Sequence, residues 1–256
     1  MIGKLSMRRR VRKALDKEDW MKASNRFATV LLLVLLLAVP VTTYAADLSV
    51  GGSVWYAWWD ESMDDASDPS IDPSFLYGPV IAIGFSPKWS LTAVFLYGAY
   101  DMEMSPGDTQ SIKRYDSDTA LNYSINRYIK LFGGAKAMGY SWKDGSHYGV
   151  GPALGIGLTL PLSDSLFLLG NLSGLYGFGR EEHDEAMGGG SSAAREAGFN
   201  STLSLAYYIE SASTTITLGG RYQWFTIKYV DNSDEFSGAS LMFYGVTLSA
   251  VYSFEL

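Results

Sequence analysis

Several charged side chains lie inside segments in which apolar residues recur at every second position, and these charges are the best candidates for chemistry. Lys136 and Arg221 each stand in the middle of such a segment. A charge in apolar surroundings needs a partner. We expect Asp116 or Asp118 to pair with Lys136 across neighbouring strands, and Glu210 or a loop carboxylate to pair with Arg221. The predicted interior polar network comprises Asp116, Asp118, Lys136, Glu210, Arg221 and Gln223.

The chain has two histidines, His147 and His183, and both fall in segments that we predict to be loops. General acid–base catalysis needs a base and a group that orients it, and no such pairing is evident. His183 stands in an acidic run whose oxygens would suit calcium or magnesium. That possible cation site consists of Glu181, Glu182, His183, Asp184 and Glu185. We predict no catalytic residues, no firm metal site and no cofactor.

Alternating apolar residues predict β-strands with one apolar face throughout the chain after residue 46. The clearest case is Ser240–Leu256, in which every even-numbered residue from Met242 onward is apolar. We predict ten strands, with eight as the alternative, at 48–59, 74–85, 89–101, 114–126, 128–142, 148–160, 166–179, 199–210, 214–230 and 240–256. Long polar loops are expected at 60–72, 102–113, 180–198 and 231–238, and short turns at 86–88, 143–146, 161–164 and 211–213.

The N-terminal segment has the features of a secretory signal peptide. Lys22 and Arg26 precede an uncharged, largely apolar run over residues 27–46, and small residues end it. We predict cleavage after Ala45, so that residues 1–45 are leader and residues 46–256 are one mature domain. The charged stretch before Met21 suggests that translation starts at Met21. A signal-anchor helix is the alternative for the apolar run.

The predicted mature chain is strongly acidic. Nine of the 20 basic residues and three of the 27 acidic residues lie in residues 1–45, which leaves 11 basic and 24 acidic residues, a formal charge of −13. Such a charge disfavours nucleic acid as a partner. The absence of cysteine is compatible with an oxidising compartment but does not require one.

A signal peptide followed by about ten alternating strands predicts an all-β transmembrane protein, an antiparallel up-and-down β-barrel. Closure satisfies the backbone polar groups that an open sheet edge would expose to lipid. Aromatic residues near the predicted strand ends would form girdles at the level of the lipid headgroups. For the end with long loops these are Trp55, Tyr56, Trp58, Trp59, Tyr97, Tyr100, Tyr140, Trp142, Tyr176 and Trp224.

The C-terminal pattern Tyr252-x-Phe254-x-Leu256 resembles the assembly signal of bacterial outer-membrane barrel proteins. In size and general pattern the chain is similar to OmpW-like and adhesin-like small barrels, without a motif specific to either. The resemblance implies insertion by the barrel assembly machinery, with outer-membrane lipid and lipopolysaccharide as neighbours. It also implies periplasmic termini and extracellular long loops.

Three functions are compatible with these features. The leading hypothesis is a non-enzymatic, structural or cell-surface interaction role through acidic outer loops. The second is a narrow channel for small or amphipathic solutes along a polar lumen. The third is a surface hydrolase, although Asp64-Asp65 and His183-Asp184 do not match the spacing of omptin-type outer-membrane proteases.

Overall fold

Long antiparallel strands make up nearly all of the structure. The computed structural model describes residues 47–63, 69–105, 108–183, 190–230 and 238–255. Within these residues there are ten long strands: β1 (Asp47–Met63), β3 (Ser74–Gly84), β4 (Trp89–Ser105), β5 (Asp108–Ser124), β6 (Ile129–Trp142), β7 (Gly145–Pro161), β8 (Leu166–His183), β9 (Gly190–Ile209), β10 (Thr214–Tyr229) and β11 (Ala239–Glu255). The two-residue strand β2 (Ser70–Ile71) pairs with β4, and the 3-10 turn η2 (Glu210–Ala212) joins β9 to β10.

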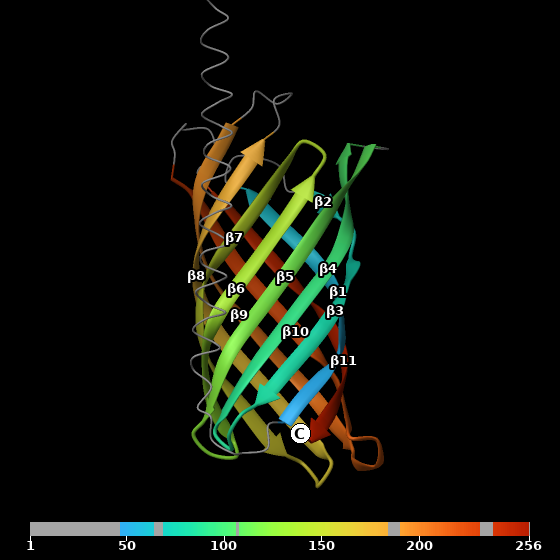
Figure 1. The fold of residues 1–256 in the computed structure, drawn as a ribbon. Coiled ribbons are helices and arrows are strands. Elements are labelled where there is room, and N and C mark those ends of the chain that lie inside the picture. Colours follow the sequence, from blue (N-terminus) through green and yellow to red (C-terminus); the bar gives the residue numbers. More distant parts are fainter. Residues whose placement is uncertain (1–46, 64–68, 106–107, 184–189, 231–237, 256) are drawn as a thin grey trace, which may run out of the picture. The chain divides into compact units, whose positions relative to one another are not determined.

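The strands close into a barrel, as the sequence predicted (Figure 1). Each long strand pairs with its neighbours in the chain, and β1 pairs with β11 over its whole length, from Asp47↔Glu255 to Met63↔Ala239. We call the end at which β1 begins and β11 ends the lower end, which is at the bottom of Figure 1. Short turns after β3, β5, β7 and β9 all lie there. Those after β3, β7 and β9 match the predicted turns 86–88, 161–164 and 211–213, whereas the predicted turn 143–146 follows β6 at the other end.

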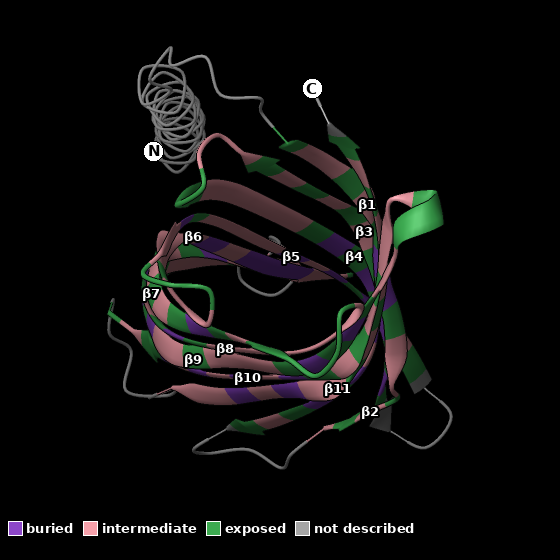
Figure 2. Ribbon diagram, turned by 90° about the horizontal axis from the view of Figure 1, so that it is seen from below, coloured by how far each residue is buried: buried purple, intermediate pink, exposed green. Residues whose placement is uncertain are grey.

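The outer face of the barrel is apolar. Every long strand contributes at least one large hydrophobic side chain that is exposed, for example Leu154 at 72%, Leu203 at 61% and Leu248 at 50%. In most strands these residues alternate with buried or half-buried ones (Figure 2). A continuous exposed apolar surface is unusual for a protein that is surrounded by water. It is the surface that a transmembrane β-barrel presents to lipid.

Two of the predicted loops are largely strand. The expected loop 102–113 is a hairpin in which β4 runs to Ser105 and β5 starts at Asp108. Likewise, β8 and β9 extend from both sides into the expected loop 180–198. Polar composition suggested loops because the apolar alternation stops there. Above the apolar belt, however, backbone pairing continues without any need for apolar side chains.

The N- and C-terminal predictions have different outcomes. The leader, the cleavage site and the Met21 start lie outside the described residues and stay predictions, as does Leu256 of the assembly signal. The other two residues of that signal, Tyr252 and Phe254, face outward on β11 and are 45% and 43% exposed. Among the described residues there is no helix long and apolar enough to cross a bilayer.

The pairing of β1 with β11 closes the barrel, so a substitution at this pair of strands tests the closure. A Cβ atom added to Gly51 would lie 2.0 Å from the backbone oxygen of Ala250, whereas one added to Gly174 on β8 would meet nothing within 4 Å. We therefore expect Gly51→Val to lower the free energy of unfolding by about 1–3 kcal/mol because the backbone must shift. Gly174→Val is the matched control and should change little. Urea unfolding in lipid vesicles, followed by tryptophan fluorescence, measures both; equal effects would contradict this closure.

Candidate functional site

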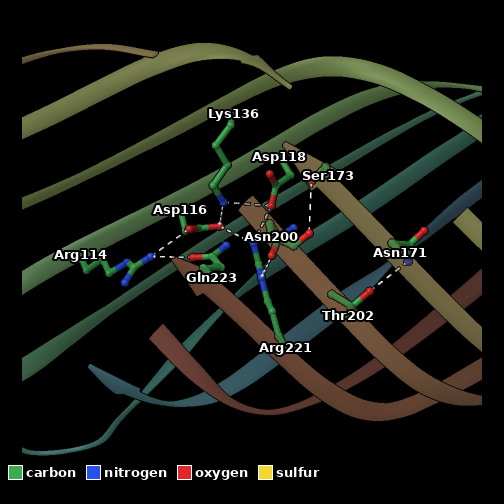
Figure 3. Close-up of polar contacts among 10 residues, drawn as sticks. All are labelled: Arg114, Asp116, Asp118, Lys136, Asn171, Ser173, Asn200, Thr202, Arg221 and Gln223. Atoms are coloured by element: carbon green, nitrogen blue, oxygen red, sulfur yellow. Dashed lines mark hydrogen bonds and ion pairs between the residues drawn. The ribbon is translucent and has the colours of Figure 1, made fainter. Parts of the chain in front are cut away.

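A network of charged side chains crosses the middle of the lumen (Figure 3). The Arg221 guanidinium, from β10, donates hydrogen bonds to Asp116 Oδ1 at 2.8 Å and Asp118 Oδ2 at 2.6 Å, both from β5. In the order of strands around the barrel, β5 and β10 are five steps apart in either direction. The contact therefore joins opposite walls.

The strand next to β5, β6, supplies a second cation. Lys136 on β6 is the direct register partner of Asp118 on β5. Its ammonium donates to Asp118 Oδ2 at 3.1 Å and to Asp116 Oδ1 at 2.6 Å. The structure thus brings together Asp116, Asp118, Lys136 and Arg221. The pairing of Lys136 with an aspartate was expected, whereas Arg221 was expected to pair with Glu210 or a loop carboxylate.

Arg114 is a member of the network that the sequence analysis did not assign. Its guanidinium donates to Asp116 Oδ2 at 3.1 Å and to Gln223 Oε1 of β10 at 2.9 Å, which makes a second contact across the lumen. The guanidinium carbon also lies 3.2 Å from the centroid of the Phe243 ring, a cation–π contact. Arg114 shares the inward parity of Asp116, so the strand pattern contained the signal that we did not use.

Glu210 does not belong to this network, and that prediction was wrong. β9 ends at Ile209, so Glu210 opens the exposed turn η2 at the lower end. Arg221 lies well up β10, with Thr202 as its register partner on β9. The strand therefore ends before Glu210 can face the lumen, and Arg221 takes its carboxylates from the opposite wall instead.

The network is nearly sealed from water. The side chains of Arg114, Asp116, Lys136 and Arg221 are 1%, 1%, 4% and 7% exposed, whereas Asp118 is 32% exposed. Removing one member of a buried ion pair is costly because it leaves the other charge unpaired. Asp116 is the central member of the network, because its carboxylate accepts hydrogen bonds from all three cations.

An apolar layer of side chains packs inside the lumen above the charges. Its largest members are almost completely buried: Trp55, Trp59, Tyr100, Phe225, Phe243, Leu76, Leu96, Ile227 and Leu241. Trp59 packs against Tyr100 and Phe243 with ring centroids 5.3 and 5.1 Å apart. The expectation that Trp55, Trp59, Tyr100 and Tyr140 belong to an outer girdle was therefore wrong. On β1, Trp55 and Trp59 have the parity opposite to Val54 and Trp58, which face outward.

A second polar cluster lies at the upper end, above the apolar layer. His147 Nε2 is 2.6 Å from Glu196 Oε1, and its Nδ1 is 3.9 Å from Glu181 Oε2. Tyr229 donates a hydrogen bond to Glu181, and His183 Nε2 lies 2.9 Å from Glu181 Oε1. Glu196 fits because its neighbours lack side chains: a Cβ at Gly149 would lie 2.1 Å from its Oε1.

This cluster corrects the placement of both histidines. We predicted loops, but His147 lies on β7 and His183 on β8, because both strands extend further up than the apolar pattern indicates. The His147–Glu196 contact has the geometry of a base with an orienting carboxylate. The His147 side chain has 0% exposure, however, and stacks on Tyr140, so no substrate atom has access to it in this structure.

The predicted cation site is only partly described. Asp184 and Glu185 lie outside the described residues. Of the remainder, Glu181 and His183 contact each other inside the barrel, whereas Glu182 faces outward, half exposed, with Arg180 3.6 Å away. No group of three or more histidines and carboxylates within the described residues is arranged to hold a metal ion.

Comparison with known proteins supports the fold and leaves the function open. No protein-family model matches this chain, and no curated protein sequence matches it. Among solved structures, the outer-membrane protease OmpT from Escherichia coli is similar, with a TM-score of 0.58 and 12% identity over 83% of this chain and 98% of that one. The outer-membrane protein OprG from Pseudomonas aeruginosa gives a TM-score of 0.37 at 12% identity, over 83% and 97% of the two chains.

At this level of identity the likeness concerns the fold alone. The chain has the closed ten-stranded fold of a small bacterial outer-membrane β-barrel. The protease activity named for OmpT is a property of that protein.

The network makes a direct prediction about stability. Replacing Lys136 with Met removes two charge-assisted hydrogen bonds inside the sealed network, to Asp116 and Asp118, and we expect the free energy of unfolding to fall by about 3 kcal/mol. Lys130 also lies on β6 with inward parity, but it forms no ion pair with another described residue. Lys130→Met is therefore the matched control, with an expected change below about 1 kcal/mol. Urea unfolding of the reconstituted barrel compares the two variants, and a larger effect at Lys130 would contradict the assignment.

Proposed function

We propose that this protein is a non-conducting outer-membrane barrel that acts at the cell surface through its acidic upper end. The observation that carries the proposal is the closure of the lumen by two stacked layers. The charged network fills the middle, and the apolar layer above it contains Trp55, Trp59 and Phe243 at 0–2% exposure. A barrel of this strand number has an interior that side chains can fill. The function would then depend on the outer surface and on the segments that connect the strands.

The charge distribution supports an outward-facing upper end. The connecting segments 64–68, 184–189 and 231–237 join strands at that end and together hold eight carboxylates and no basic residue. The turns of the lower end are short, as periplasmic turns of such barrels are. In this orientation the termini are periplasmic and the acidic segments meet the outer leaflet. Divalent cations would bridge these carboxylates to anionic lipopolysaccharide.

Conductance separates this proposal from a channel. In planar bilayers, the wild-type barrel should give no reproducible conductance steps, because no water path crosses the apolar layer. The double variant Trp59→Ala with Phe243→Ala removes two rings of that layer and should conduct. Trp58→Ala, which alters the outward-facing neighbour, is the control and should stay silent. Reproducible wild-type steps would exclude a closed lumen and favour the channel.

The surface role has its own test. We expect magnesium to raise the Tm of the barrel in bilayers that contain lipopolysaccharide. The combined variant Asp231→Asn, Asp234→Asn and Glu235→Gln should lose much of this gain because it removes three carboxylates from one upper segment. Glu210→Gln, at the opposite end, should keep it. A magnesium effect that is equal in all three proteins would contradict a role for the upper carboxylates.

A further inference from the structure

Hydrogen-bond donors without partners gather where the charged network meets the apolar layer. Among the described residues, buried side-chain atoms without a hydrogen-bond partner include Arg114 Nη1, Gln223 Nε2, Trp55 Nε1, Trp59 Nε1 and Tyr100 Oη. All can donate a hydrogen bond, and all but the tyrosine hydroxyl can only donate. A buried donor without a partner costs about 1–3 kcal/mol, so five in one region call for an acceptor.

The residues that carry these donors contact Arg114 or are linked to it by ring packing. The Arg114 guanidinium bonds the Gln223 side chain at 2.9 Å and lies 5.7 Å from the Trp55 ring centroid. Phe243, which it contacts directly, packs on Trp59, and Trp59 packs on Tyr100. The unpartnered groups therefore share one level of the lumen.

The same level carries an excess positive charge. Arg114, Lys136 and Arg221 supply three cations, and their five ion pairs among the described residues all end on Asp116 or Asp118. Two carboxylates leave one cation uncompensated. Asp118 is the more exposed of the two, at 32%, so the sealed part of the network is more positive still. An uncompensated buried charge is destabilising by several kcal/mol.

We infer that this level of the lumen binds one monovalent, monatomic anion, for which chloride is the natural probe. One negative charge neutralises the network, and a halide accepts hydrogen bonds from several donors at once. Water is a poorer match because it brings two hydrogens that need acceptors, and it leaves the charge uncompensated. The unpartnered atoms are enclosed, which disfavours larger anions.

Halide titration of the folded mature barrel tests the inference. At constant ionic strength, replacing gluconate by chloride or bromide should raise Tm saturably, by roughly 5–10 °C at about 100 times the dissociation constant. Bromide should also quench tryptophan fluorescence with the same half-saturation, because Trp55 and Trp59 border the site. A Tm that does not distinguish chloride from gluconate overturns the inference.

Variants locate the anion. Gln223→Glu places a carboxylate beside Arg114 and should abolish the chloride dependence while keeping the Tm in gluconate at or above that of the wild type. Arg114→Met removes the excess charge and should also abolish it; if that variant does not fold, Gln223→Glu still decides. Lys130→Met, outside the network, should retain the full shift. A chloride shift that survives in Gln223→Glu, or that is lost in Lys130→Met, would show that the anion does not bind here.

Discussion

The contact between Asp116 on β5 and Arg221 on β10 is the interaction on which the interior of this barrel depends. The two strands stand on opposite walls, so a hydrogen bond of 2.8 Å between their side chains fixes the distance across the lumen. A carboxylate that is 1% exposed cannot lose its partners without a large cost, because nothing else nearby solvates it. Backbone pairing closes the cylinder, and this network determines what the cylinder can contain.

The other side chains of the lumen form layers below and above the contact between Asp116 and Arg221. Below it, short polar side chains pair across strands, as in Ser53 with Ser249 at 2.8 Å and Asn171 with Thr202 at 3.0 Å. Above it, packed aromatic rings exclude water and strengthen the electrostatic interactions beneath them. The cluster of His147, Glu181 and Glu196 stands beyond the rings. A lumen filled in this way supports our proposal that the function lies at the surface.

Alternation predicted ten strands, with eight as the alternative, and closure was predicted because an open sheet edge would expose backbone polar groups to lipid. The inward direction of Lys136 was also predicted, because a charge facing lipid would be far costlier than one facing its partners. The pairing of Lys136 with the aspartates was predicted too, since adjacent strands are joined by a short turn. The partner of Arg221 was not predictable, because contacts across a lumen depend on barrel size and stagger rather than on chain neighbours. Trp55 and Trp59 were assigned to the outer girdle because they lie near a predicted strand end, although their parity in the strand places them inside. His147 was assigned to a loop because the polar part of β7 lacks the apolar alternation that we used to recognise strands.

The central claim is that the lumen is sealed between the two aqueous sides of the membrane. The reactivity of introduced cysteines tests this claim most directly, because the chain has no natural cysteine that would react as well. Ala57 faces the apolar layer at 0% exposure, Thr202 lies inside below the charges, and Ala250 faces outward. In reconstituted vesicles, Ala57→Cys should resist a charged maleimide added to either side, Thr202→Cys should react from one side only, and Ala250→Cys should react only with a lipid-soluble reagent. Rapid labelling of Ala57→Cys by the charged reagent from both sides would contradict the sealed interior.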